Sequence, residues 1–405
     1  MLFSTGLFFW SSITTLMPTL PLYIQSIGGT NQQIGWVMGA FAIGLLPSRI
    51  GLGPLADSRG RKLVLIIGAF VAMAAPLGYL LVASIPPLFG IRAFHGISVA
   101  AFTIGFSALV ADLAPVHRRG EVIGYMGLVA PIGMAIGPAV GGFIEDMAGY
   151  QSLFLTSSIL GLVALIGVFQ VQEPERPVLA KVGLEVIPSP RPNWQRVTTS
   201  YVKLLSSPPL RTPTLVMFSV GLIFGSLVTF LPLYVQASGL TLNAGLFYST
   251  AAIASFSSRF FVGRASDRYG RGLFITLGLG FYLLSMIMLA NAQDKFILLT
   301  AAVLEGTGAG IVIPTMLALI TDRCPPNQRG KYFSLCVGGF DLGIALAGPI
   351  FGWIAEQAGY RNMYLLNVVL ALLGMLVFMF QSSKTVKLSL KFSTGQARDA
   401  YRLDT

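Results

Sequence analysis

Four ionisable side chains stand out inside long apolar runs, where charged residues are rare. Arg92 and His95 are three residues apart and would share one face of a helix, whereas Glu305 and Asp341 lie near the middle of two later runs. Burial disfavours the charged form of a carboxylate, so Glu305 and Asp341 could carry protons, or they could bind a cationic substrate directly. Arg92 and His95 could equally be structural groups that hydrogen-bond within the protein. The chemistry predicted is exchange of a proton or a cation without covalent catalysis.

Membrane helices must position these side chains, because the chain is too apolar for a water-soluble protein. It has 405 residues, of which 54% are hydrophobic and 11% charged, whereas soluble domains carry about 25% charged residues. The apolar runs are as long as a bilayer-crossing helix and lack the alternation of barrel strands. We predict an all-α integral membrane protein with twelve spans, at residues 4–25, 32–53, 62–82, 86–110, 122–144, 151–171, 212–236, 243–263, 272–291, 295–320, 331–354 and 361–380.

A long polar, proline-rich interval divides these spans into two groups. The predicted domains are an N-terminal six-helix bundle at 1–171, a cytoplasmic linker at 172–211, a C-terminal six-helix bundle at 212–381 and a basic, partly disordered cytoplasmic tail at 382–405. Lys and Arg are concentrated in the loops on one side of the spans. By the positive-inside rule that side, with both termini, is cytoplasmic. The net charge of +11 is therefore a signal of topology, and its scatter over short loops argues against a nucleic-acid partner.

The two groups of spans are copies of one another. Gly53 to Lys62 reads GPLADSRGRK and Gly263 to Gly272 reads GRASDRYGRG, while LPLYIQSIGGT at Leu20 is echoed by LPLYVQASGLT at Leu231. Each copy would begin on the cytoplasmic side, so the repeats are parallel and related by an axis along the membrane normal. This symmetry predicts a cavity between two pseudo-symmetric bundles, near the midplane.

The repeated turn resembles that of the major facilitator superfamily, and the resemblance extends over essentially the whole chain. Its Gly, Asp, Gly and basic positions fall on Gly53, Asp57, Gly60, Arg61 and Lys62 and, in the second copy, on Gly263, Asp267, Arg268, Gly270 and Arg271. Ser58 departs from the family, which usually has a basic residue there. The resemblance implies the major facilitator fold, in which this turn latches one conformation.

We expect the latch glycines to let helix ends approach closely, and its aspartates to accept backbone donors or to face the positive end of a neighbouring helix. The glycines in question are Gly53 and Gly263, and the aspartates are Asp57 and Asp267. The alternative is that the charges only fix the topology of the loops.

A second resemblance lies in the fifth span, where GLVAPIGMAIGPAVGG carries Gly133, Gly137, Pro138, Gly141 and Gly142. The pattern is similar to one found in the drug:proton antiporters of the superfamily, and it favours export. The alternative is ordinary tight packing, because glycines four apart form a groove for a neighbouring helix and Pro138 can kink its own helix. Arg92, followed by Gly96, is similar to the fourth-span pattern that the family links to proton transfer.

The resemblance implies a secondary transporter without enzymatic activity that exports lipophilic or amphipathic small molecules in exchange for protons, by alternating access. Alternatives are a sugar, metabolite or siderophore exporter, a uniporter, or a membrane sensor or assembly factor that transports nothing. No cofactor or metal is predicted, since the sequence has no nucleotide-binding loop and Cys324 and Cys336 lack a metal-binding spacing. The expected partners are the substrate, protons and the bilayer, and the expected form is a monomer in the cell membrane.

Overall fold

The computed structural model describes residues 1–173, 203–240, 242–325 and 328–403. Secondary structure in these ranges is helical, with no strand. The α-helices are α1 (Leu2–Thr15), α2 (Leu20–Ser26), α3 (Asn31–Arg59), α4 (Arg61–Leu81), α5 (Ile85–Leu113), α6 (Arg119–Met126), α7 (Val129–Gln170), α9 (Pro208–Ala237), α10 (Ala244–Tyr269), α11 (Arg271–Ala290), α12 (Lys295–Arg323), α13 (Arg329–Gln381) and α14 (Val386–Ser393). The predicted linker lies mostly outside the described residues.

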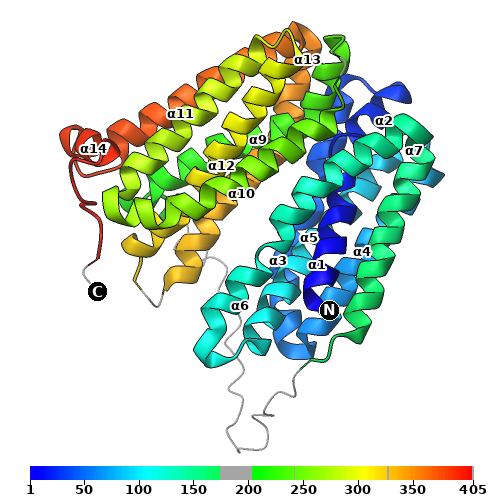
Figure 1. Cartoon of the computed structure of the whole chain (residues 1–405), viewed down its shortest axis with the longest axis horizontal. Helices are drawn as coiled ribbons and strands as arrows, with labels where there is room; N and C mark the ends of the chain where they lie inside the picture. The colour runs from blue at the N-terminus through cyan, green and yellow to red at the C-terminus, as the bar shows by residue number, and fades with distance from the viewer. Residues whose placement is uncertain (174–202, 241, 326–327, 404–405) are drawn as a thin grey trace, which may run out of the picture.

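The helices account for the twelve predicted passes. Within the described residues, nine stretches are long and apolar enough to cross a membrane, and α1 and α2 together form the first of them. Helices α7 and α13 each contain two passes, because the chain reverses at Gly149 (φ 74°) and Gly359 (φ 77°) (Figure 1). Both glycines have a left-handed backbone that other residues rarely adopt. Helix α10 supplies a further pass, although its polar residues place it outside the nine.

Local sequence explains where the helices begin and end. Thr30 caps α3 by accepting a hydrogen bond from the Gln33 amide, and the Gln33 side chain accepts one from the Thr30 amide, which completes a capping box. Asp294 caps α12 through two backbone amides. Gly60 (φ 118°) separates α3 from α4, and Gly270 (φ 101°) separates α10 from α11. The two latch turns are therefore fixed by the same backbone requirement.

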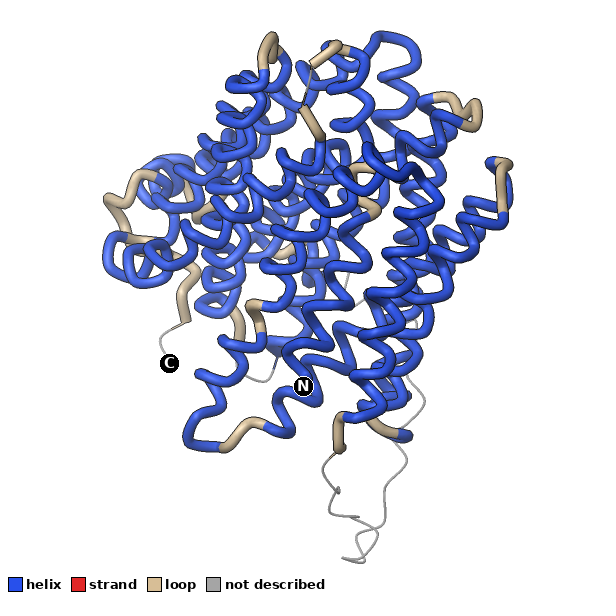
Figure 2. Tube along the Cα trace, turned by 45° about the vertical axis from the view of Figure 1, so that its right-hand side comes forward, coloured by secondary structure: helices blue, strands red, loops and turns tan. Residues whose placement is uncertain are grey.

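The two halves repeat the same packing. In the N-terminal half α5 packs on α3, with Gly96 against the carbonyl of Phe41; in the C-terminal half α12 packs on α10, with Gly306 against the carbonyl of Ala251. A Cβ at either glycine would collide with that carbonyl. Figures 1 and 2 show the halves as two tilted bundles. The pseudo-symmetry predicted from the repeat is therefore present down to single backbone contacts.

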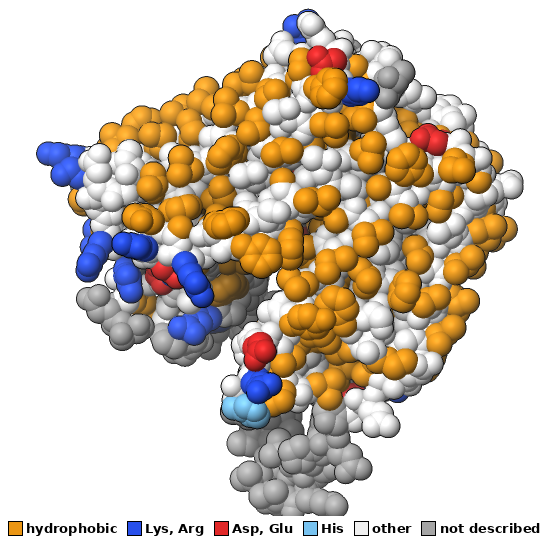
Figure 3. Space-filling model, viewed as in Figure 1, with side chains coloured by type: hydrophobic (Ala, Val, Ile, Leu, Met, Phe, Trp, Pro, Cys, Tyr) orange, Lys and Arg blue, Asp and Glu red, His pale blue; other side chains and the backbone are white. Residues whose placement is uncertain are grey.

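The halves meet at one end of the bundles, which we call the sealed end, along two seams in which α3 packs on α13 and α7 on α10 (Figure 1). A Cβ on Gly35 would collide with the carbonyl of Gly348, and the reverse also holds. Tyr360 donates a hydrogen bond to Asn31 across the first seam (2.6 Å). At the other end, the open end, which includes both chain termini, the surface is notched between the halves (Figure 3).

The outer surface of the bundles is apolar. The exposed side chains include many large hydrophobic ones, such as Phe260, Phe261 and Met147. The face drawn in Figure 3 is broadly apolar between the two ends. Exposed apolar area of this extent is unfavourable in water and suits contact with lipid chains. Charged side chains gather near the two ends.

The C-terminal tail corrects one expectation. We predicted a partly disordered extension, but residues 382–403 fold back onto the C-terminal half, and α14 packs on α13 and α11. Phe392 is 3% exposed, and Asp399 forms an ion pair with the fully buried Arg323. Composition suggested a basic, solvated segment, whereas a few tail residues find partners that only the folded bundle creates.

Candidate functional site: a central ion pair and two buried ionisable groups

An ion pair joins the two halves on the open-end side of the glycine contacts between α3 and α13. Arg49 Nη1 of α3 lies 2.5 Å from Asp341 Oδ2 of α13, and the side chains are 36% and 15% exposed. Gly39 is the next glycine of the seam after Gly35, and Arg49 follows it by ten residues. Arg49 is therefore about 15 Å farther from the sealed end than Gly39, measured along α3. Asp341 lies ten residues inside its predicted span and Arg49 lies four residues from the end of its own, so the pair occurs in the open-end half of the predicted membrane region, where a charge needs a partner.

Our sequence reasoning singled out Asp341 but missed Arg49, although a signal was present. Ser48 and Arg49 recur as Ser258 and Arg259 at the repeat spacing of about 210 residues, inside the spans that precede the two latch turns. A basic residue repeated within a membrane span is a stronger indication of function than one found once. The repeat could therefore have identified Arg49, but not the partner that it contacts.

Glu305 lies inside the C-terminal half, away from this ion pair. Its side chain is 5% exposed, and among the described residues its Oε1 atom has no hydrogen-bond partner. Tyr248 and Tyr282 lie within electrostatic range, and the buried hydroxyl of Tyr282 also lacks a partner among the described residues. A carboxyl group in such surroundings is stable when protonated, because burial of an unpaired carboxylate is costly. Glu305 and Asp341 thus have different surroundings and occupy separate sites.

Arg92 and His95 share one face of α5, as their spacing predicts. Arg92 Nη1 lies 3.5 Å from His95 Nδ1, and the hydroxyl of Tyr79 lies 3.2 Å from the same nitrogen. The Arg92 guanidinium also stacks on Phe41, 4.5 Å from the ring centroid. His95 is fully buried, and by the repeat it occupies the position equivalent to Glu305. Each half therefore carries one buried ionisable group at the same place.

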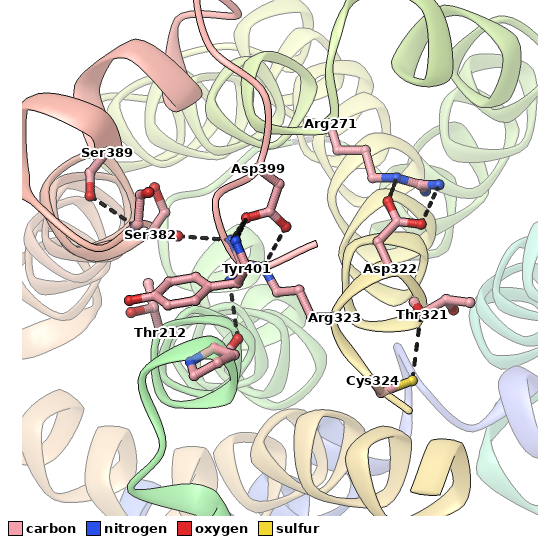
Figure 4. Close-up of polar contacts among 12 residues, drawn as sticks. Thr212, Arg271, Thr321, Asp322, Arg323, Cys324, Ser382, Ser389, Asp399 and Tyr401 are labelled. Atoms are coloured by element: carbon pink, nitrogen blue, oxygen red, sulfur yellow. Dashed lines mark hydrogen bonds and ion pairs between the residues drawn. The ribbon is translucent and has the colours of Figure 1, made fainter. Parts of the chain in front are cut away.

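The latch residues form matching charge clusters. In the first copy Arg61 lies between Asp112 (3.0 Å) and Asp57 (3.7 Å). In the second copy Arg271 lies between Asp322 (2.5 Å) and Asp267 (3.3 Å), and Figure 4 shows the Arg271–Asp322 contact. The latch charges are therefore paired within each half, at the open end. Their role in switching between conformations stays a prediction.

Two details of the latch differ from our expectations. A Cβ at Gly53 or Gly263 would meet no atom within 4 Å, so these glycines do not bring helix ends together here, because they lie at the open end where the halves are apart. At the start of α4, the backbone amides of Arg61 (2.9 Å) and Lys62 (3.1 Å) donate hydrogen bonds to the carboxylate of Glu173. Glu173 thus occupies the positive helix end that we had considered for Asp57.

The glycines of the fifth span pack in two directions. Gly133, Gly137 and Gly141 lie against Trp10, Thr14 and Thr15 of α1, and Thr14 donates a hydrogen bond to the Gly133 carbonyl (2.9 Å). On the other side of α7, Gly142 lies against Asn243 and the Pro138 carbonyl lies against Gly245, both in the C-terminal half. The motif therefore contributes to tight packing and to the second seam, and its link with export stays a prediction.

Gly35→Val should weaken the sealed end, because the added side chain would meet the backbone of Gly348. Overpacking of this kind costs about 1–3 kcal/mol, which shifts the equilibrium away from the closed seam by roughly 5- to 150-fold. The measurement is thiol labelling of Met38→Cys, a buried position on α3 three residues from Gly35, from the sealed-end side, in a chain without native cysteines. The control is Gly51→Val on the same helix, where a Cβ meets no atom within 4 Å. Equal labelling in both variants would contradict the prediction.

The chain matches the profile of one known protein family. The family profile described as Major Facilitator Superfamily matches residues 2–294 and 253–398. The chain belongs to the Major Facilitator Superfamily. It is an all-α, multi-pass membrane protein and a transporter of this superfamily, and the transporters of this family are generally not enzymes.

Curated relatives include exporters. The chain is 27% identical over 365 residues to the multi-drug resistance efflux pump PmrA of Streptococcus pneumoniae, covering 87% of this chain and 88% of the relative. It is 28% identical over 375 residues to the multidrug resistance protein MdtG of Proteus mirabilis (87% and 88%). It is 24% identical over 384 residues to the staphylopine export protein of Staphylococcus aureus (93% and 94%).

Solved structures agree with the fold. The nucleoside transporter NupG superposes with a TM-score of 0.77 at 14% identity, covering 93% of this chain and 98% of that chain. A bacterial homologue of the lysosomal transporter Spinster, in an inward-facing and unoccupied conformation, has a TM-score of 0.74 at 13% identity (100% and 96%). At such low identity these likenesses confirm the major facilitator fold alone.

Proposed function

We propose that this chain exports lipophilic or amphipathic small molecules in exchange for protons, by alternating access between its two halves. The observation that carries the proposal is the Arg49–Asp341 ion pair between the halves. The multidrug efflux pumps among the relatives support the direction of transport and the kind of substrate. The open end would face the cytoplasm, with both termini, because its loops are basic. One chain supplies both halves of the pathway, so a monomer in the cell membrane would suffice.

The ion pair would prevent the empty carrier from changing conformation. An antiporter must not switch sides without cargo, because an empty transition uncouples the two fluxes. Asp341 attracts Arg49 only while it is ionised and unoccupied, and this attraction holds the sealed end closed. A proton or a cationic group of the substrate would neutralise Asp341, release Arg49 and allow the halves to move. Competition of proton and substrate for one carboxylate then produces exchange without covalent chemistry.

Glu305 would carry a second proton within the C-terminal half. Glu305→Gln should retain the fold, because an amide can replace a protonated carboxyl, but should lower the number of protons released per substrate, because only the proton exchanged at Asp341 remains. The measurement is proton efflux from acid-loaded everted vesicles while lipophilic cations, neutral drugs and small metabolites are added in turn. The matched control is Glu121→Gln, which removes an exposed carboxylate. Wild-type proton release in Glu305→Gln would remove Glu305 from the mechanism.

The same panel of compounds separates the alternative functions. The second candidate is export of a sugar, metabolite or siderophore, and it is supported by a relative that is named for the export of one compound, staphylopine. Proton release triggered only by small metabolites would support that candidate, and substrate flux without proton release would indicate a uniporter. No flux of any compound, with insertion into the membrane confirmed, would indicate a sensor or an assembly factor.

A further inference from the structure

A pocket of about 650 Å³ lies at the open end of the C-terminal half, between the second latch turn and the docked tail. Its charged lining residues are Arg268, Arg271, Arg398 and Arg402, together with Asp267, Asp322 and Asp399. We propose that this pocket binds the headgroup phosphate of an anionic phospholipid from the adjacent leaflet. The site is separate from the transport pathway and goes beyond the proposed function.

Residues of the C-terminal tail form one wall of the pocket, and Arg323 holds this part of the tail in place. Its Nε and Nη2 atoms contact the two carboxylate oxygens of Asp399, at 2.7 and 3.0 Å. The same guanidinium donates to the carbonyls of Pro209 (3.0 Å) and Ser382 (2.8 Å) and lies over the ring of Tyr401. Figure 4 shows these contacts converging on one side chain. The tail is thus a fixed part of the bundle, and a pocket that it walls is preformed.

The charges that line the pocket leave an excess of unpaired guanidinium groups. Arg271 pairs with both Asp322 and Asp267, which leaves one surplus negative charge in this group, and Asp399 is neutralised by Arg323. Among the described residues, Arg268, Arg398 and Arg402 have no carboxylate within 4.0 Å. Guanidinium groups bind phosphate oxygens through paired hydrogen bonds. The pocket therefore presents three unpaired guanidinium groups against one surplus carboxylate charge, which leaves it net positive.

The internal repeat shows what occupies the same position in the other half. The first amides of α4 donate hydrogen bonds to the carboxylate of Glu173. Helix α11 is the repeat of α4 and begins beside the pocket at Arg271, and its N-cap residue, Gly270, has no side chain with which to cap it. An anion is bound at this helix end in one copy, and the arginine-lined pocket occupies the equivalent place in the other.

The surroundings favour a lipid over a soluble anion. Helix α14 exposes Val386 (57%) and Leu388 (38%) beside three exposed lysines, Lys384, Lys387 and Lys391. An apolar pair flanked by lysines on a short helix is typical of a segment that lies in the membrane interface. In Figure 3 the basic side chains of this corner border the apolar surface. A headgroup in the pocket would leave the acyl chains on that surface, and the anionic cytoplasmic leaflet would supply the lipid.

The test is lipid binding to the purified full-length chain in detergent. Phosphatidylglycerol, phosphatidylethanolamine and inorganic phosphate are titrated separately, and bound lipid is counted by native mass spectrometry. We expect phosphatidylglycerol to bind at least tenfold more tightly than phosphatidylethanolamine, and Arg398→Gln/Arg402→Gln to weaken it by about tenfold to thirtyfold. The matched control, Arg118→Gln/Lys331→Gln, removes two exposed basic residues from the same end but outside the pocket, and should change the affinity less than twofold.

Three results would overturn the proposal. One is equal affinity of the wild-type chain for the two lipids, which needs no variant and so does not depend on how the variants fold. Another is an equal loss of affinity in the control pair, which would indicate general surface attraction. The third is competition by inorganic phosphate at the same concentration as the lipid, which would assign the pocket to a soluble anion. The test measures lipid binding and not transport. A negative result would therefore leave the transport proposal intact, and failure of the transport proposal would leave the lipid site intact.

Discussion

Asp341→Asn is expected to abolish uphill export while leaving downhill flux of the substrate. An amide carries no charge, so Arg49 loses its partner and proton and substrate no longer compete at this site. A partly exposed pair contributes about 0.2–1 kcal/mol to closure of the sealed end, but removal of the exchangeable proton eliminates coupling. The measurement compares substrate accumulation in everted vesicles with and without a proton gradient. We expect the gradient to increase accumulation in the wild type and to have no effect in the variant.

Arg49 provides the complementary test. Arg49→Gln should retain the carboxylate but release the lock, so that protons leak in the absence of substrate. Reversal of both charges, Arg49→Asp with Asp341→Arg, should restore protection of the seam from thiol labelling, because the attraction is the same in either direction. Glu356→Gln is the matched control, since Glu356 also accepts a hydrogen bond across the seam, from the Gln32 amide (3.4 Å), but is exposed. If substrate accumulation by Asp341→Asn still depends on the proton gradient, the Arg49–Asp341 ion pair does not act as the proposed lock.

Asp399→Asn should cause a large loss of stability, because it removes one partner of a buried ion pair. The side chain of Arg323 is fully buried and that of Asp399 is 7% exposed, and breaking such a pair from one side costs about 3–5 kcal/mol. We expect the Tm of the purified chain to fall by several degrees and residues 382–403 to become sensitive to protease. Transport should fall less than stability, because α14 packs on α11 and on α13 at the open end, away from the seams of the sealed end.

Two variants make this prediction specific. Asp267→Asn removes a 66% exposed carboxylate from the neighbouring latch cluster and should change the Tm little. Replacing both buried partners, Arg323→Met with Asp399→Leu, should be less harmful than Asp399→Asn alone, because it leaves no buried charge without a partner. An unchanged Tm in Asp399→Asn would mean that the tail is held by its apolar contacts, chiefly Phe392.

Much of the architecture follows from the sequence. Apolar length determines that the chain crosses a membrane as helices, since hydrocarbon forces each segment to satisfy its own backbone hydrogen bonds. The repeat spacing determines that two halves share one packing, and the matching contacts of Gly96 and Gly306 confirm it. The spacing of Arg92 and His95 places them together because both lie on one helix face. These predictions succeed because they depend on local periodicity or on internal copies.

The pairing of side chains across the molecule was decided only by the tertiary structure. Asp341 was visible in the sequence as an isolated intramembrane acid, but its partner Arg49 lies 292 residues away in the chain and in the other half. Asp399 similarly finds Arg323 only because four helix ends converge at the base of the C-terminal half. Composition predicted a basic, partly disordered tail, because an average over residues carries no information on a single buried contact. The sequence by itself determined the elements and their symmetry, whereas long-range contacts, set by how the helices pack, decided which charges meet.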